Sequence, residues 1–297
     1  MFASPAALWR LGRQAIESWS DDGAPSMGAA LAYYTLFSVA PLLLIVVSVA
    51  GFVFGEEAAR GEVFGQLEHL MGAQSAAAIQ GLLQSANKPA ESAVATFIGV
   101  VALLIGATTV FAELQSALDR IWRAPVRGAN GIFALVRARL LSFGMILGLG
   151  FLLMVSLVVS AALAAFEKWW SPVFGAWALL AQGLNFLVSF FFVTAVFAMI
   201  YKFMPRVHVA WRDVGVGAAA TALLFTVGKH LIGLYIGRSS ITSAFGAAGS
   251  LAVLLVWLYY SAQIFLLGAE FTWVYAHTYG SRRGSERPRA ERPAGSA

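Results

Sequence analysis

The hydrophobic positions of this chain form long runs that charged residues rarely interrupt. A helix needs about 20 apolar residues to cross a bilayer, so each run predicts a membrane-spanning helix. The fifth run is the least uniform, because Lys229 and His230 lie within it. The six predicted spans are residues 27–54, 92–112, 140–166, 177–200, 214–237 and 248–273.

Apolar residues within these runs do not alternate with polar ones. Residues 41–47 are all apolar, whereas a strand of a membrane barrel alternates over about 10 residues. A helix in lipid also satisfies its own backbone hydrogen bonds. The pattern therefore predicts an all-α polytopic membrane bundle of six transmembrane helices, with residues 1–280 as one domain.

The first segment outside the spans is expected to be a helix over residues 6–19. Its apolar residues Leu8, Trp9, Ile16 and Trp19 lie near one face. Such a face beside arginine residues is typical of an interfacial helix on the cytoplasmic leaflet. An ordinary first helix packed on the bundle would show the same pattern, so both interpretations stay open.

Two further segments lie outside the spans. Residues 56–91 carry apolar residues at helical spacing, which predicts two short amphipathic helices separated near Gly72. These helices would cap the bundle on its outer side or lie on the outer leaflet. Residues 281–297 are rich in Arg, Pro and Gly, which predicts a disordered basic cytoplasmic tail.

Composition supports a membrane location. Charged residues make up 12% of the 297 residues and hydrophobic residues 59%, with a mean hydropathy of +0.75. Soluble domains carry about 25% charged residues, so this chain has too few charges to cover a water-exposed surface. The chain has no cysteine, which excludes disulfides and thiol chemistry.

The distribution of basic residues predicts the orientation in the membrane. Fifteen of the 20 Lys and Arg residues lie before the first span, after the second and fourth spans, or in the tail. Basic residues concentrate on the cytoplasmic side, so both termini are expected there. This bias accounts for the net charge of +5 without a nucleic-acid partner.

Lys229 is the charge that most needs an explanation. It follows Asp213 by 16 residues, which is about 24 Å along a helix. This spacing places it in the outer part of the fifth span. Lys229 would either extend to the outer headgroups or face an interior cavity and bind an anionic group.

Other polar or irregular positions are weaker candidates. Asn185, Gln263, Tyr259 and Tyr260 would line a substrate site or, alternatively, join helices. Candidates for a cytoplasmic gate are Glu113 and Glu270, which would pair with Arg120, Arg123 or Arg212 or, alternatively, be ordinary solvated carboxylates at the interface. A helix kink or irregular backbone is expected at Pro41, Gly246 and Gly249.

Motifs for known chemistry are missing from the sequence. The four histidines form no HExxH motif or other pair at metal-ligand spacing, and no phosphate-binding loop or GxSxG turn occurs. We therefore expect no catalytic residues, no metal and no cofactor. The expected partners are membrane lipids, with a homo-oligomer left open, and nucleic acid is not among them.

Several ordered segments resemble the YihY/BrkB family of bacterial inner-membrane proteins, over about residues 8–280. The segments are residues 30–41 (ALAYYTLFSVAP), 111–122 (FAELQSALDRIW), 201–205 (YKFMP), 211–214 (WRDV), 228–229 (GK), 246–250 (GAAGS), 257–264 (WLYYSAQI) and 268–272 (GAEFT). The resemblance implies a six-helix protein of the bacterial inner membrane with both termini cytoplasmic.

The resemblance also limits the functional hypotheses. The family was once labelled a ribonuclease, a label regarded as mistaken, and members have been connected with serum resistance and envelope lipid transport. It supplies no settled catalytic or substrate residues. The leading hypothesis is a transporter or flippase-like permease for an anionic lipid or another amphipathic envelope molecule. The alternatives are a non-transporting membrane scaffold for envelope integrity and, last, a membrane-bound ribonuclease.

Overall fold

The computed structural model describes residues 5–86, 109–125, 144, 148, 177–238 and 249–284, and it contains no strand among them. The predicted all-α class is therefore confirmed for this part of the chain. A further helical segment covers residues 109–121. The labelled helices are α1 (Pro5–Asp21), α2 (Ala24–Phe54), α3 (Glu56–Met71), α4 (Ala73–Ala86), α7 (Trp177–Phe203), α8 (Trp211–Arg238) and α10 (Gly249–Thr278).

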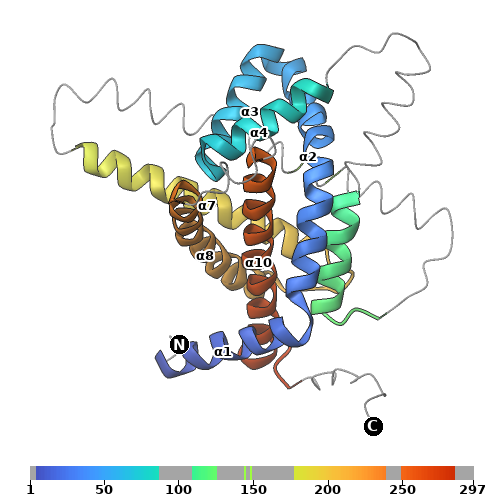
Figure 1. Ribbon diagram of the computed structural model, residues 1–297. Helices are drawn as coiled ribbons and strands as arrows, with labels where there is room; N and C mark the ends of the chain where they lie inside the picture. The colour runs from blue at the N-terminus through green and yellow to red at the C-terminus, as the bar shows by residue number, and fades with distance from the viewer. Residues whose placement is uncertain are drawn as a thin grey trace.

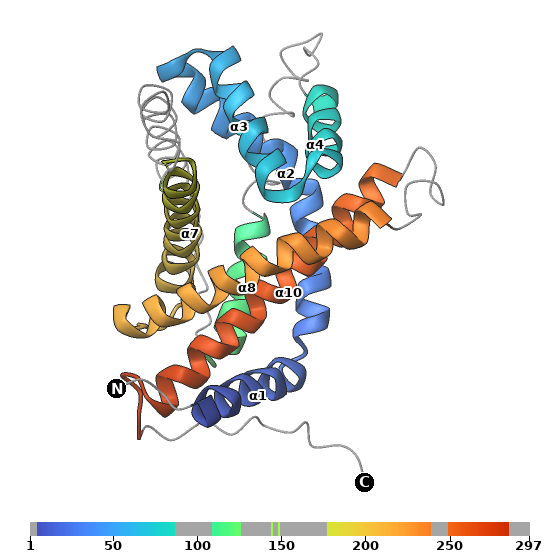
Figure 2. The same cartoon turned by 90° about the vertical axis from the view of Figure 1, so that its left-hand side faces the viewer.

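Helix α10 runs through the middle of the described bundle (Figure 1) and packs on α8, α2, α1 and α4. α1 crosses the C-terminal end of α10, whereas α3 and α4 lie at the opposite end. Figure 2 shows α8 and α10 side by side along much of their length. The bundle thus has one end built around α1 and another covered by α3 and α4.

Three described helices contain segments long and apolar enough to cross a membrane: Phe186–Phe203, Trp211–Ile236 and Leu251–Thr278. The two parts of α2, Ala24–Ala40 and Leu42–Ser48, are bent by 41° and count as a fourth span if taken together. They meet at Pro41, the expected kink position, whose ring removes a backbone donor.

The count of six spans stays a prediction. Residues 92–108 of the second predicted span lie outside the described residues, as does the third span except for Gly144 and Gly148, which are helical. Gly246 also lies outside them, whereas Gly249 begins α10. The four other predicted spans fall on α2, α7, α8 and α10.

One side of α1 packs on the bundle, and the other side exposes apolar residues. Ala7, Leu11 and Ala15 are buried, and the helix packs on α10. Leu8 and Trp9 are 55% and 76% exposed. α1 is therefore packed on the bundle through small and apolar residues while it presents other apolar side chains outward, where a bilayer surface would accommodate them.

The opposite end is covered by a helical hairpin. Gly72 separates α3 from α4 and has a φ of +81°, a conformation that glycine adopts without steric cost. Ile79 and Leu83 of α4 are buried, and α4 packs on both α10 and α2. The hairpin therefore closes this end of the bundle through apolar contacts.

The crossing of α8 and α10 depends on paired Gly-x-x-x-Thr segments. Thr221 donates to the carbonyl of Gly217 at 2.7 Å, and Thr272 donates to that of Gly268 at 2.7 Å. Each threonine packs on the glycine of the other helix: a Cβ on Gly217 would lie 1.8 Å from Thr272 Oγ1, and one on Gly268 would lie 2.0 Å from Thr221 Oγ1. Because membrane helices associate through close packing, these glycines set the distance between the two helices.

Candidate functional site

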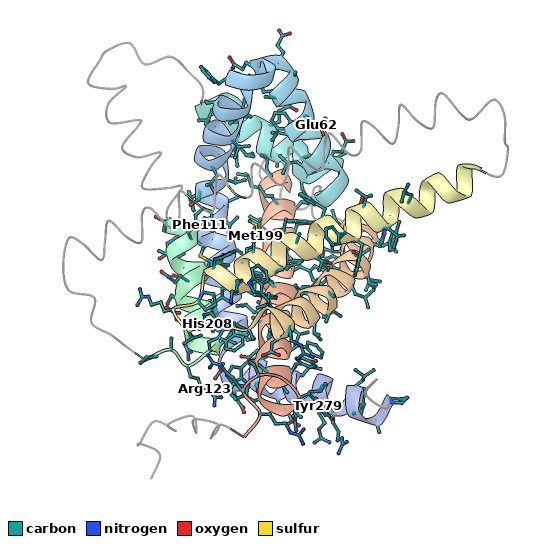
Figure 3. The ribbon with its side chains drawn as sticks, turned by 180° about the vertical axis from the view of Figure 1, so that it is seen from behind. Glu62, Phe111, Arg123, Met199, His208 and Tyr279 are labelled. Carbon is teal, nitrogen blue, oxygen red and sulfur yellow. The ribbon has the colours of Figure 1, made fainter. Side chains whose placement is uncertain are left out.

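Polar contacts between distant segments of the described chain gather at the end of the bundle where α1 crosses α10. Figure 3 shows Arg123, His208 and Tyr279 at this end and Glu62 at the other. The contributing segments are the α1–α2 turn, residues 109–125, the α7–α8 loop and the end of α10. We call this end the polar end of the bundle.

Residues 109–125 are attached to the α7–α8 loop. Gln115 Nε2 donates to the carbonyl of Met204 at 3.0 Å. The backbone N–H of Arg206 donates to Asp119 Oδ1 at 2.7 Å, and its guanidinium lies 3.3 Å from Oδ2. Burial raises the pKa of Asp119 above its ordinary value, although the Arg206 backbone N–H and guanidinium act in the opposite direction. Asp119 therefore positions the loop that leads into α8.

A second attachment joins α8 to the residues that follow α10. Asp213, buried in the first turn of α8, accepts hydrogen bonds from Ser281 N at 3.0 Å and Ser281 Oγ at 2.6 Å. Arg282 donates to the carbonyl of His208 at 2.9 Å and lies over the Trp122 ring at 5.3 Å. The start of α8 and the end of α10 are thus held together by a carboxylate.

Glu270 is the most unusual group at the polar end. Glu270 is 0% exposed, and neither of its carboxyl oxygens has a hydrogen-bond donor among the described residues. Asp22 lies within hydrogen-bonding reach, and Arg123 and Asp21 interact with Glu270 electrostatically. A carboxylate without a hydrogen-bond donor is costly to bury, so the Glu270 carboxyl group is expected to bind a proton or a cation.

The predicted gate residues differ in their surroundings. Glu270 interacts with Arg123. Arg120 is exposed and lies near the α1–α2 turn, where a Cβ on Gly23 would be 3.9 Å from Arg120 Nη2, and Arg212 is exposed. Glu113 is partly exposed and forms no ion pair in the described part of the chain. The groups that do accompany Glu270, namely Asp22 and Arg123, come from the α1–α2 turn and the end of the 109–121 helix.

Lys229 lies on the inward side of α8. Ala222, seven residues before it, and Ile232, three residues after it, are both buried, and residues at these spacings share a helix face. Lys229 is half-buried, and it has no ion pair or hydrogen bond within the described ranges. The outward face of α8 is apolar, with Leu223, Val227 and Leu231 more than half exposed.

The other substrate candidates are dispersed. Tyr260 packs on α8 at Gly228, the residue before Lys229, because a Cβ on Gly228 would be 2.9 Å from the Tyr260 hydroxyl. Tyr259 is 39% exposed. Gln263 instead donates to the carbonyl of Pro25 at 3.4 Å and so joins α10 to α2. The side chain of Asn185 lies outside the described residues.

Comparison with known proteins identifies the family of this chain. The family described as virulence factor BrkB matches residues 15–293. The chain belongs to this family. It is 29% identical over 255 residues to a UPF0761 membrane protein of Tolumonas auensis, with 84% of this chain and 80% of the relative covered.

Two further relatives carry the same description. The chain is 28% identical to a UPF0761 membrane protein of Azotobacter vinelandii, covering 97% of this chain and 67% of the relative. It is 30% identical to one of Pseudomonas aeruginosa, covering 84% of this chain and 58% of the relative. The chain thus spans little more than half of the Pseudomonas protein. No solved structure matches it.

Several of the segments that resemble the family contribute to the polar end of this BrkB-family chain. Asp119 and Trp122 belong to the FAELQSALDRIW segment, Asp213 to WRDV and Glu270 to GAEFT. The structure brings these segments, which are far apart in sequence, to one end of the bundle. These segments therefore supply contacts that position α8 and α10.

Sequence reasoning missed several of these groups. The sequence marks Asp213 as a reference point for Lys229 and as part of the WRDV segment, and it predicts no role for Asp22 or Ser281. Asp213 and Asp22 are acids next to predicted spans, and an acid at a membrane boundary is a usable signal for a buried pair. Ser281 carries no comparable signal because its role depends on the turn after α10.

We expect Tyr201→Phe to lower the stability of this BrkB-family protein by about 1 kcal/mol. The fully buried Tyr201 hydroxyl donates to the carbonyl of Phe265 at 2.7 Å and lies 3.2 Å from Thr221 Oγ1. Unfolding in a detergent–denaturant titration measures the change. Tyr235→Phe, at an exposed tyrosine of α8, is the matched control, and an equal loss in both variants would contradict the assignment.

Proposed function

We propose that this BrkB-family membrane protein is a permease for an anionic lipid or a related amphipathic anion, with Lys229 as its head-group-binding cation. The observation that carries the proposal is the inward position of a half-buried lysine without a counter-ion in the described part of the bundle. A charge at membrane depth is costly unless it meets a partner or water. An anionic head group would supply that partner.

The neighbours of Lys229 support an amphipathic ligand. Tyr260 brings a hydroxyl to the adjacent Gly228. The apolar residues Ile232, Leu254, Trp257 and Leu258 form one buried cluster near this level of α8 and α10. A cation and a hydroxyl next to apolar side chains suit a molecule with a charged head and an apolar body.

Reconstituted protein tests the proposal. Vesicles would carry a fluorescent anionic phospholipid, and a membrane-impermeant quencher would report its movement between leaflets. Interactions with charged groups contribute about 1.5–3 kcal/mol, so Lys229→Ala is expected to slow movement about tenfold or more. Lys229→Arg keeps the charge and is expected to retain most of the rate.

A matched variant separates the role of the charge from its effects on packing. His230→Ala changes the next residue, which is exposed, and is expected to move the anionic lipid at the wild-type rate. The proposal fails if wild-type protein moves no anionic lipid or small anion. A stable envelope partner recovered by crosslinking from the same preparation would then favour the scaffold alternative.

A further inference from the structure

The carboxyl groups of Glu270 and Asp22 form a buried acidic contact at the polar end. Both Glu270 oxygens and Asp22 Oδ2 are shielded from solvent and have no hydrogen-bond donor among the described residues. The two side chains are nevertheless within hydrogen-bonding reach of each other. Two carboxylates cannot donate to each other, so the contact becomes a hydrogen bond only when one of them carries a proton.

The chain geometry holds the two carboxyl groups together. Asp22 lies in the turn between α1 and α2, next to Gly23, whose φ is +70°. Glu270 lies on α10, and α1 packs on α10. A proton shared by Asp22 and Glu270 would therefore join the α1–α2 turn to α10.

Arg123 is fixed near this pair by a strained backbone. Its φ is +49°, a left-handed conformation that costs a non-glycine residue free energy. The bonds from Arg123 N to Arg120 O and from Ala124 N to Asp119 O form the helix-ending pattern that requires it. Its guanidinium lies 4.6 Å from the Trp273 ring, one helical turn after Glu270.

Charge balance favours one proton in the pair. A singly protonated Asp22–Glu270 pair carries one negative charge, which Arg123 offsets. Without the proton, two adjacent carboxylates would repel each other in a buried place. The other charged or titratable groups are Asp21 on α1, Arg120 beside Gly23, Asp213 bound to Ser281 and His277 bound to the Trp273 carbonyl.

We propose that Asp22 and Glu270 form a proton-binding pair and that its protonation state, set by the pH at the polar end, controls cargo movement. Binding forms one O–H bond with a proton from water at the polar end, and release returns that proton to water. Loss of the proton separates the α1–α2 turn from α10 through charge repulsion. The control of cargo movement rests on the proposed permease function, whereas proton binding does not.

Infrared spectroscopy tests proton binding without any transport. Full-length protein in lipid nanodiscs at neutral pH is expected to show the carbonyl stretch of a protonated carboxylic acid. Glu270→Gln and Asp22→Asn should each lose this band, whereas Glu68→Gln, at an exposed glutamate of α3, should retain it. Absence of the band in wild type, or its persistence in both pair variants, overturns the proposal.

Fold integrity is controlled within the same experiment. Glutamine resembles a protonated glutamate in shape and charge, so Glu270→Gln is expected to unfold at the wild-type denaturant concentration. If Glu270 were instead an ionised partner of Arg123 alone, the same variant would unfold earlier and wild type would show no acid band. The two roles therefore give opposite results in both measurements.

Control of cargo movement is tested in vesicles with a pH gradient. Wild-type movement of the fluorescent anionic phospholipid should respond to the direction of the gradient, and Glu270→Gln should lose that response while Glu68→Gln keeps it. Lipid movement that ignores the gradient overturns this control. If no lipid moves under any condition, the permease function fails, and the infrared band decides separately whether the pair binds a proton.

Discussion

Gly268→Ala is expected to lower the free energy of unfolding by about 2–4 kcal/mol. An added Cβ would lie 2.0 Å from Thr221 Oγ1 and 2.7 Å from Tyr201 Oη. Neither group can move freely, because Tyr201 donates to the Phe265 carbonyl and Thr221 to the Gly217 carbonyl. α8 and α10 must therefore separate or give up these hydrogen bonds.

The expected loss is measured by equilibrium unfolding in detergent and checked by a second substitution. Adding Thr221→Ala to Gly268→Ala removes the clashing hydroxyl and should recover part of the stability, as a double-mutant cycle would show. Gly215→Ala on α8 is the matched control, because a Cβ there meets nothing within 4 Å. Equal stability of Gly268→Ala and Gly215→Ala would mean that the close approach does not set the helix distance.

The helical class and the positions of four spans were accessible from the sequence. Apolar runs without charges report directly on what lipid tolerates. The predicted ends were less accurate: the last span was expected to stop at residue 273, yet α10 continues to Thr278. Hydropathy marks where a helix leaves apolar surroundings, whereas a helix ends where its backbone finds other partners. Beyond Trp273, α10 stays helical because Val274 and Ala276 are buried in the bundle. The turn that follows α10 is held in place because Ser281 donates a hydrogen bond to Asp213.

The partners within the candidate site were much less predictable. Glu270 is separated in sequence from Asp22 by most of the chain, and Asp213 from Ser281 by 68 residues. No period or motif links such pairs, because their proximity arises from the crossing of α1, α8 and α10. The sequence did identify Glu270 and Lys229 as unusual, since charge near apolar runs is rare. It offered Arg123 among the partners of Glu270, and Arg123 does interact with Glu270, but it did not indicate Asp22.

For Lys229, the sequence predicts the depth in the membrane but not the direction in which the side chain points. Depth along α8 follows from counting residues, but the inward or outward direction depends on which face packs. The buried positions at 222 and 232 place Lys229 on the packed side. Such a face is not visible in a helix whose two sides are both apolar, because lipid and helix partners select similar side chains.

Asp213→Ala is expected to lower the free energy of unfolding by about 2–4 kcal/mol, because charged hydrogen bonds contribute about 1.5–3 kcal/mol. The carboxylate accepts from both Ser281 N and Ser281 Oγ. Alanine would leave these donors without their acceptor. An anion in the first turn of α8 also stabilises the helix dipole by about 0.3–1 kcal/mol. Asp213→Asn keeps one acceptor and should lose less stability.

Asp213→Ala should also loosen the turn after α10 in particular. Releasing Ser281 would free Arg282 from the His208 carbonyl and the Trp122 ring, so trypsin should cleave at Arg282 and Arg283 sooner. Glu57→Ala, at an exposed acid in the first turn of α3, removes only a dipole contact and is expected to cost less than about 1 kcal/mol. Unchanged cleavage in Asp213→Ala would show that the contact with Ser281 does not hold the turn. If Asp213→Ala is cleaved faster but its free energy of unfolding is almost unchanged, the contact between Asp213 and Ser281 lies outside the cooperative unit formed by α8 and α10.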